Sequence, residues 1–89
     1  MNPKVEIYTW SWCPFCIRAK QLLNQKKVEF AEYTIDGNEV ARDEMAVRSN
    51  GSRSLPQIFI NDRHIGGCDD LYSLESQGEL DPLLQGEGV

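Results

Sequence analysis

The stretch TWSWCPFCIRAK (residues 9–20) places two cysteines, Cys13 and Cys16, where the pattern of apolar residues changes period. Pro14 suits the first turn of a helix, because its missing N–H is not needed there. From that point apolar side chains recur at helical spacing, at Phe15, Ala19, Leu22 and Leu23. We therefore predict that both cysteines lie at the start of a helix.

The segments on either side of this helix alternate as strands do. In residues 4–10, Val5 and Ile7 share one face, and polar or aromatic residues occupy the other. Residues 28–35 (VEFAEYTI) repeat the alternation. The three elements predict a βαβ unit, in which the two strands are parallel and the crossover is right-handed.

Two further elements are predicted in the second half of the chain. A helix is expected over residues 39–49, with an apolar face made of Val40, Ala41 and Met45. Residues 56–67 contain two short β-like runs joined at Asn61 and Asp62, which both tolerate tight turns. This pattern predicts a β-hairpin.

A last helical segment is predicted over residues 68–84, where Leu71 and Leu74 recur at helical spacing and Asp69 or Asp70 can cap the start. The whole order predicts an α/β fold: a four-stranded mixed sheet, βαβ plus β-hairpin, flanked by helices. Reactive groups in such sheets collect at the carboxyl ends of the parallel strands, where the cysteine pair lies.

Composition and charge narrow the classes of protein. The 89 residues suit a single domain (1–89), of which residues 86–89 are expected to fray, and the apolar and charged fractions, 40% and 26%, are those of a soluble globular protein. A net charge of -5 without a basic cluster argues against nucleic acid or anionic membranes as partners. No apolar run approaches the roughly 18 residues of a membrane span, so we predict a cytoplasmic protein.

The cysteine pair allows three interpretations: a metal site, a structural disulfide or a redox pair. Cys13, Cys16, His64 and Cys68 could supply four zinc ligands, but Ile17 continues a helix where zinc knuckles usually have glycine. A disulfide across so short a loop constrains the unfolded chain little. The redox interpretation is favoured, and no metal is predicted.

The two cysteines are expected to have unequal roles. Cys13 falls at the helix start, where free backbone N–H groups and the helix dipole stabilise a thiolate, which is the nucleophile in disulfide exchange. Cys16 lies one turn deeper and is expected to be less exposed. We therefore predict that Cys13 attacks and that Cys16 resolves the mixed disulfide.

Three segments together resemble the signature segments of dithiol glutaredoxins, which have the thioredoxin-like fold: CPFC (13–16), SLPQIFI (54–60) and GGCDDL (66–71). The resemblance extends from about Val5 to Leu84. It implies a glutathione-dependent thiol–disulfide oxidoreductase that reduces protein disulfides and glutathione mixed disulfides. It also implies glutathione as co-substrate, no tightly bound cofactor, disulfide-containing or glutathionylated proteins as partners, and a monomer.

The resemblance also implies a glutathione site. Pro56 matches a proline that is cis in this family, which would turn the backbone of Leu55 toward an extended peptide such as glutathione. The GGCDDL segment matches the region that receives the γ-glutamyl end, through N–H groups at a helix start and an aspartate. The expected glutathione contacts are Phe15, Ser54, Leu55, Pro56, Gly67, Cys68, Asp69 and Asp70.

Two tryptophans depart from the family pattern. Trp10 stands where many glutaredoxins carry a lysine that contacts the glycyl carboxylate of glutathione, and Trp12 stands where they carry threonine. We expect Arg48 or Arg53 to supply the missing charge. His64 is expected to be a surface residue of the hairpin.

Two other functions stay open at this point. Some glutaredoxins hold an iron–sulfur cluster between two subunits through the first cysteine and glutathione, but relatives of that kind generally have Gly or Ser where this chain has Pro14. Trp12 suggests a second alternative, a thioredoxin-like protein that is reduced by a flavoprotein reductase.

Overall fold

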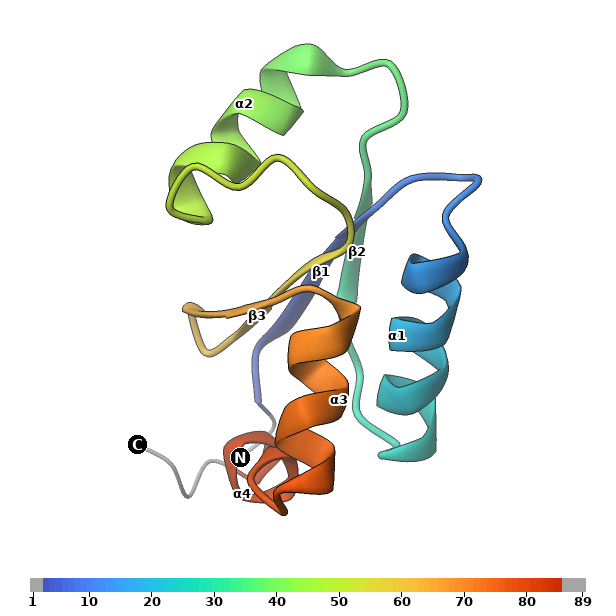
Figure 1. The fold of residues 1–89 in the computed structure, drawn as a ribbon, viewed down its shortest axis with the longest axis vertical. Coiled ribbons are helices and arrows are strands. Elements are labelled where there is room, and N and C mark those ends of the chain that lie inside the picture. Colours follow the sequence, from blue (N-terminus) through green and yellow to red (C-terminus); the bar gives the residue numbers. More distant parts are fainter. Residues whose placement is uncertain (1–2, 86–89) are drawn as a thin grey trace.

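The computed structural model describes residues 3–85, which form a mixed sheet with helices around it (Figure 1). In chain order the elements are β1 (Val5–Thr9), α1 (Pro14–Gln25), β2 (Ala31–Thr34), α2 (Glu39–Arg48), β3 (Gln57–Ile60), β4 (Arg63–Gly66), α3 (Cys68–Ser76) and α4 (Leu80–Leu84). The strand order is β2-β1-β3-β4; β1 is parallel to β2, and the other pairs are antiparallel. The predicted four-stranded mixed sheet is confirmed.

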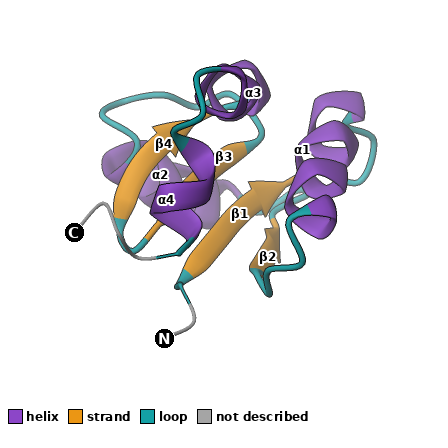
Figure 2. Ribbon diagram, turned by 90° about the horizontal axis from the view of Figure 1, so that it is seen from below, coloured by secondary structure: helices purple, strands orange, loops and turns teal. Residues whose placement is uncertain are grey.

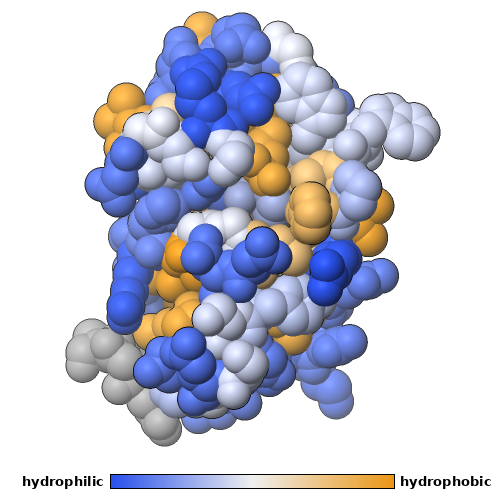
Figure 3. Space-filling model, viewed as in Figure 1, coloured by the Kyte–Doolittle hydropathy of each residue, from blue (hydrophilic) through white to orange (hydrophobic). Residues whose placement is uncertain are grey.

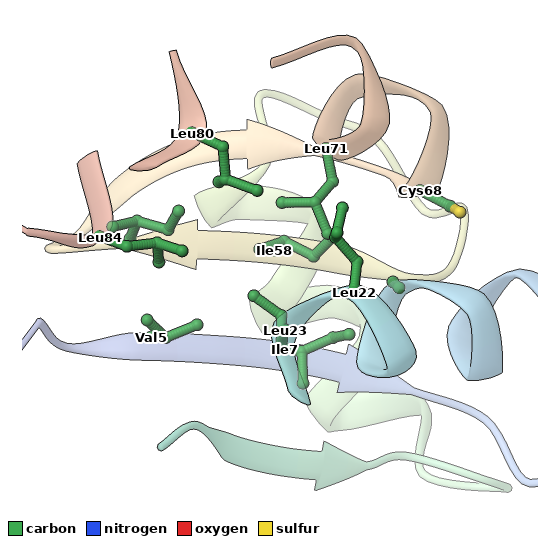
Figure 4. Close-up of a cluster of buried hydrophobic side chains, with 11 residues drawn as sticks. Val5, Ile7, Leu22, Leu23, Ile58, Cys68, Leu71, Leu80 and Leu84 are labelled. Carbon is green, nitrogen blue, oxygen red and sulfur yellow. The ribbon is translucent and has the colours of Figure 1, made fainter. Parts of the chain in front are cut away.

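One face of the sheet carries the hydrophobic core. Ile7 of β1 and Ile58 of β3 are paired across the sheet and fully buried. Leu23 of α1 and Leu71 of α3 pack into the same cluster (Figure 4). Figure 2 shows α1 and α3 on the same side of the strands. Burial of these side chains holds the start of α1 and the start of α3 near each other.

The opposite face of β1 is organised by polar contacts with α2. Glu6 is buried, and its carboxylate accepts hydrogen bonds from Arg48 at 2.9 and 3.2 Å and from the Tyr33 hydroxyl at 2.9 Å. Arg48 also donates to the Tyr8 hydroxyl and lies 4.0 Å from the centre of the Phe59 ring. The Arg48 hydrogen bond lowers the pKa of Glu6. This network, Glu6–Arg48–Tyr33, fastens the end of α2 to the sheet.

The predicted hairpin turn is confirmed, but the predicted last helix is divided into two shorter helices. Asn61 and Asp62 both have positive φ, 52° and 66°, as a tight turn between β3 and β4 requires. The predicted helix 68–84 is broken in two, because Gly78 adopts a left-handed conformation (φ 73°) between α3 and α4. The sequence pattern missed this break because leucines continue on both sides of it.

The pattern of apolar residues predicted the wrong exposure for two side chains and the wrong start for one strand. Val40 is 68% exposed, so the predicted face of α2 is wrong there; the buried residues are Met45 and Ala46, one to two turns further on. Phe15, predicted on the apolar face of α1, is 53% exposed. The second strand begins at Ala31 rather than at residue 28.

The predicted frayed tail, residues 86–89, lies outside the described residues. Among residues 3–85, none of the helices is both long and apolar enough to cross a bilayer.

Candidate active site

Cys13 and Cys16 are joined by a disulfide at the start of α1, with their Cα atoms 5.1 Å apart. Cys13 is the N-cap residue: its sulfur accepts the backbone N–H of Cys16 at 3.1 Å, and its carbonyl accepts that of Ile17 at 3.1 Å. Cys13 is partly exposed, whereas Cys16 is only 1% exposed. The predicted placement at a helix start, with one outer and one inner cysteine, is confirmed.

This position favours a charged sulfur on Cys13. The amides of the first helical turn point toward the cap, and residues 14–17 include no acidic side chain that would compete for them. An amide hydrogen bond to sulfur stabilises the anion more than the neutral thiol. The Cys16 sulfur is not accessible in this way, because Cys16 packs beneath the same turn and is buried.

The loop between β1 and α1 is held by Asp36, which follows the second parallel strand. The Asp36 carboxylate accepts the Ser11 backbone N–H at 2.9 and 3.1 Å. The neighbouring Ile35 N–H donates to the Thr9 carbonyl at 3.0 Å. The cysteine pair is thus anchored to the end of the second parallel strand as well as to the first.

A cavity of about 230 Å³ lies beside the start of α1 and is lined by all eight residues expected to contact glutathione. The lining comprises Phe15, Ser54, Leu55, Pro56, Gly67, Cys68, Asp69 and Asp70. These residues come from three separate segments: α1, the loop before β3 and the start of α3. The fold therefore brings three segments that are distant in the sequence to the same cavity.

Backbone conformation shapes two walls of this cavity. The Leu55–Pro56 bond is cis, as the resemblance implied. Gly66 has φ 118°, and a Cβ there would run into the Asp70 carboxyl group. The Asp70 carboxylate accepts the Gly67 backbone N–H at 3.0 Å, so Asp70, which lies within the first turn, caps α3. Glycine is required where the strand turns so closely into the helix.

The third cysteine differs from the pair. Cys68 opens α3 and belongs to the hydrophobic core, where it is 4% exposed (Figure 4). Burial raises the pKa of the Cys68 thiol. A buried, protonated thiol is a poor nucleophile.

The structure does not bring Arg48 to the cavity, because its guanidinium is bound to Glu6 and Tyr8 on the α2 face of the sheet. Arg53 is paired with Asp43 at 2.7 Å. A different arginine is found beside Trp10: the Arg42 guanidinium lies 5.5 Å from the centre of that ring. Only the tertiary fold reveals this pairing, because 32 positions separate the two residues in the sequence.

Arg42 also supports the loop before Pro56. Its guanidinium donates to the Arg53 carbonyl at 2.9 and 3.1 Å. Arg42 therefore connects Trp10, near the cysteine pair, to the segment that forms one wall of the cavity. The local sequence does not single out Arg42, because a charged residue is ordinary on the solvated face of a helix.

The possible zinc ligands are not assembled into a metal site. Cys13 is bonded to Cys16, and His64, expected at the surface, is half-buried with Nε2 2.7 Å from Gln57 Oε1. Across residues 3–85, His, Cys, Asp and Glu side chains form no group of three or more placed to hold a metal ion.

Apolar side chains are exposed around the cysteine pair. Trp12, the residue before Cys13, is 90% exposed, and Phe15 and Ile17 are also exposed. In Figure 3 hydrophobic atoms appear as separate patches on a mostly polar face. Side chains of this kind are available to contact another molecule that reaches Cys13.

The fold and the site together define a thiol–disulfide oxidoreductase of the thioredoxin-like class: a cysteine pair at a helix start, a cis-proline loop and a cavity between them. A family model described as Glutaredoxin matches residues 5–65. The chain belongs to the glutaredoxin family.

Individual relatives agree with this assignment. The chain is 66% identical over 84 residues to a probable glutaredoxin of Synechocystis sp., covering 94% of this chain and 96% of the relative. It is 59% identical over 81 residues to glutaredoxin 3 of Escherichia coli, covering 91% and 96%. The structure of a buckwheat glutaredoxin–glutathione complex matches with a TM-score of 0.87 at 26% identity, covering 97% of this chain and 80% of that one. The predicted family, fold and oxidoreductase class are confirmed.

Proposed function

We propose that the protein reduces protein disulfides and glutathione mixed disulfides by a dithiol mechanism in which Cys13 attacks and Cys16 resolves. The observation that carries this proposal is the difference between the two sulfurs: Cys13 caps α1 and is accessible, whereas Cys16 is buried behind it. A substrate disulfide can approach the first sulfur but not the second.

The Cys13 thiolate attacks one sulfur of the substrate disulfide, the substrate S–S bond breaks, and the leaving thiolate takes up a proton. Cys16 then loses its proton and attacks the Cys13 sulfur, which releases the second substrate thiol and forms the Cys13–Cys16 disulfide. Two molecules of glutathione reduce this disulfide and leave as oxidised glutathione. With a glutathione mixed disulfide, a second glutathione can replace Cys16 as the resolving thiol.

Glutathione is proposed to bind in the cavity that Phe15 and the Ser54–Pro56 loop line. The γ-glutamyl carboxylate would meet the N–H groups at the start of α3, and Asp69 or Asp70 would face its ammonium group. The cysteinyl backbone would pair with Leu55. The glutathione complex of the buckwheat relative supports a site for this tripeptide in the fold.

The glycyl carboxylate requires a cation that Trp10 does not supply. We assign this role to Arg42, in place of Arg48 and Arg53, because Arg42 lies over the Trp10 ring. Its contact with the Arg53 carbonyl leaves other N–H groups of the guanidinium available. Trp10 would then hold the cation by its ring face instead of providing one itself.

The two alternatives receive less support. The relatives are glutaredoxins, which favours glutathione over a flavoprotein reductase as the source of electrons. Pro14 disfavours the cluster carrier. We further propose that the protein acts as a monomer in the cytoplasm, with disulfide-containing or glutathionylated proteins as partners.

The experiment compares Cys13→Ser and Cys16→Ser with a glutathione mixed disulfide and with a protein disulfide as substrates. Cys13→Ser should be inactive on both, and Cys16→Ser should retain activity on the mixed disulfide alone. Activity of Cys13→Ser would contradict the assignment of roles. Turnover with thioredoxin reductase but not with glutathione, or a brown dimer on anaerobic purification, would favour the alternatives.

A further inference from the structure

A buried amide stands behind the loop that forms one wall of the cavity. Gln57 opens β3 and is 2% exposed, next to the buried apolar side chains of Ile58 and Phe59. Burying an amide is costly unless its donors and acceptor are paired. Such a residue therefore indicates a hydrogen-bond network.

The amide nitrogen of Gln57 faces the loop before Pro56. Gln57 Nε2 lies 3.0 Å from the Ser54 carbonyl oxygen, 3.1 Å from Ser54 Oγ and 2.9 Å from Ser52 Oγ. A carbonyl oxygen only accepts hydrogen bonds, so the atom beside it must be the amide nitrogen. Gln57 Oε1 must then point away from the loop.

Gln57 Oε1 faces the hairpin strand β4, where His64 Nε2 lies 2.7 Å away. Because Oε1 only accepts, His64 Nε2 must carry a hydrogen, in the neutral ring as in the imidazolium. Phe59 is paired with His64 across β3 and β4, and the two ring centres are 5.2 Å apart. Hydrogen bonds thus run from His64 through Gln57 to Ser54.

We propose that Gln57 and His64 are positioning residues for glutathione binding, which act by holding the backbone of Ser54 and Leu55. Ser54 and Leu55 line the cavity, and the Gln57 amide binds the Ser54 carbonyl, which belongs to the peptide bond between these two residues, from the buried side. The inference rests on the proposed glutathione site. A loop that loses these bonds presents its backbone in several conformations, so glutathione binds more weakly while Cys13 is unaffected.

The test compares four variants in turnover of a mixed disulfide with glutathione. Gln57→Leu removes the buried hydrogen bond to the Ser54 carbonyl, and His64→Leu weakens it by removing the bond that orients the Gln57 amide. Each should raise the KM for glutathione, by up to about tenfold. Neither should change kcat at saturating glutathione or the rate of Cys13 alkylation. His64→Gln places an amide N–H at a similar reach and should restore a near-normal KM. Gln21→Leu, which changes an exposed glutamine of α1, is the matched control.

Amide hydrogen exchange over residues 52–57, measured without glutathione, tests directly whether Gln57 and His64 hold the loop. Exchange should be faster in both leucine variants, normal in His64→Gln, and unchanged in β1 in all of them. An unchanged KM in Gln57→Leu, or His64→Gln behaving like His64→Leu, overturns the inference. Failure of the wild type to use glutathione would instead refute the proposed function, and exchange alone would then decide whether Gln57 and His64 hold the loop.

Discussion

The two halves of the active site are built in different ways. The cysteine half is local: Cys13, Pro14 and Cys16 belong to one helical turn, and the helix start provides the amides that face the sulfur. The cavity half is assembled from α1, the Ser54–Pro56 loop and the start of α3, which are more than ten positions apart in the chain. The first half depends on a motif, whereas the second depends on the whole sheet.

This difference predicts different kinetic effects. Changes in the cysteine half should alter the chemical steps, because they change the attacking or the resolving sulfur. Changes in the cavity half should alter the KM for glutathione, because they change where the tripeptide is held. The following variants test that separation.

The largest effect is expected for Gly66→Ala. The new Cβ would collide with the Asp70 carboxyl group at a backbone conformation that disfavours a side chain. We expect about 2–3 kcal/mol of lost stability and a KM for glutathione raised about 30-fold. Chemical denaturation and steady-state kinetics measure both.

Gly78→Ala is the matched control for that variant. Gly78 also has a positive φ, 73°, but a Cβ there would meet open space, and the residue lies at the far end of α3. It should cost about 1 kcal/mol of stability and leave the KM unchanged. Equal KM values for the two variants would show that the cavity wall does not depend on Gly66.

The Glu6–Arg48–Tyr33 network lies outside both halves. Glu6→Gln should cost roughly 2 kcal/mol of stability, because it removes the buried carboxylate that Arg48 binds and leaves the longer ion pair of Arg48 with Asp62, at 3.5 Å. The KM for glutathione should stay unchanged. The pKa of Glu6 is lowered in the folded state, so its contribution is present above the ordinary value of 4.5 and is lost as the pH falls below it.

Thermal unfolding between pH 3 and pH 7 measures this contribution. The difference in stability between wild type and Glu6→Gln should be constant near neutrality and should shrink below about pH 4.5. A difference that does not change with pH would mean that the ion pair is not the source of the effect.

A smaller effect is expected for Asp70→Asn. The amide oxygen can still accept the Gly67 N–H, so the cap of α3 is kept, but the negative charge is lost. The KM for glutathione should rise about tenfold with little change in kcat. A fall in kcat with an unchanged KM would instead show that Asp70 acts with the cysteine half of the site.

The smallest effect is expected for Arg42→Met, which keeps an unbranched side chain over Trp10 but removes the guanidinium. A solvent-exposed charge pair contributes less than 1 kcal/mol, so the KM should rise about threefold. The part of the increase that comes from the lost charge should disappear at high salt, whereas any part that comes from the lost hydrogen bonds to the Arg53 carbonyl should remain. Arg48→Met, measured in parallel, should leave the KM unchanged.

Sequence alone predicted the cysteine half well, because its physics is local. Pro14 and the helical spacing place Cys13 at a helix start, and that placement implies the inequality of the two sulfurs. It also predicted the sheet, since alternation and turn residues are local signals. The residues that line the cavity were predicted from the resemblance to a family, because no periodic pattern relates Phe15 to Leu55 or Asp70.

Other features could not be predicted from local patterns. Asp36, Gln57 and Arg42 act through hydrogen bonds to residues far along the chain or to loop backbone, and each had an adequate local explanation as a turn, strand or helix-surface residue. The exposure of Val40 follows from how α2 lies on the sheet. Polar contacts of this kind depend on tertiary geometry and leave no periodic signal.

The dithiol mechanism requires Cys13 to be the sulfur that attacks the substrate. The most direct measurement treats the reduced Cys16→Ser variant, which retains Cys13 and Cys68, with oxidised glutathione and locates the adduct by peptide mass spectrometry. The structure predicts glutathione on Cys13 alone, because Cys68 is buried and its thiol has a raised pKa. An adduct on Cys68, or none at all, would contradict this role of Cys13.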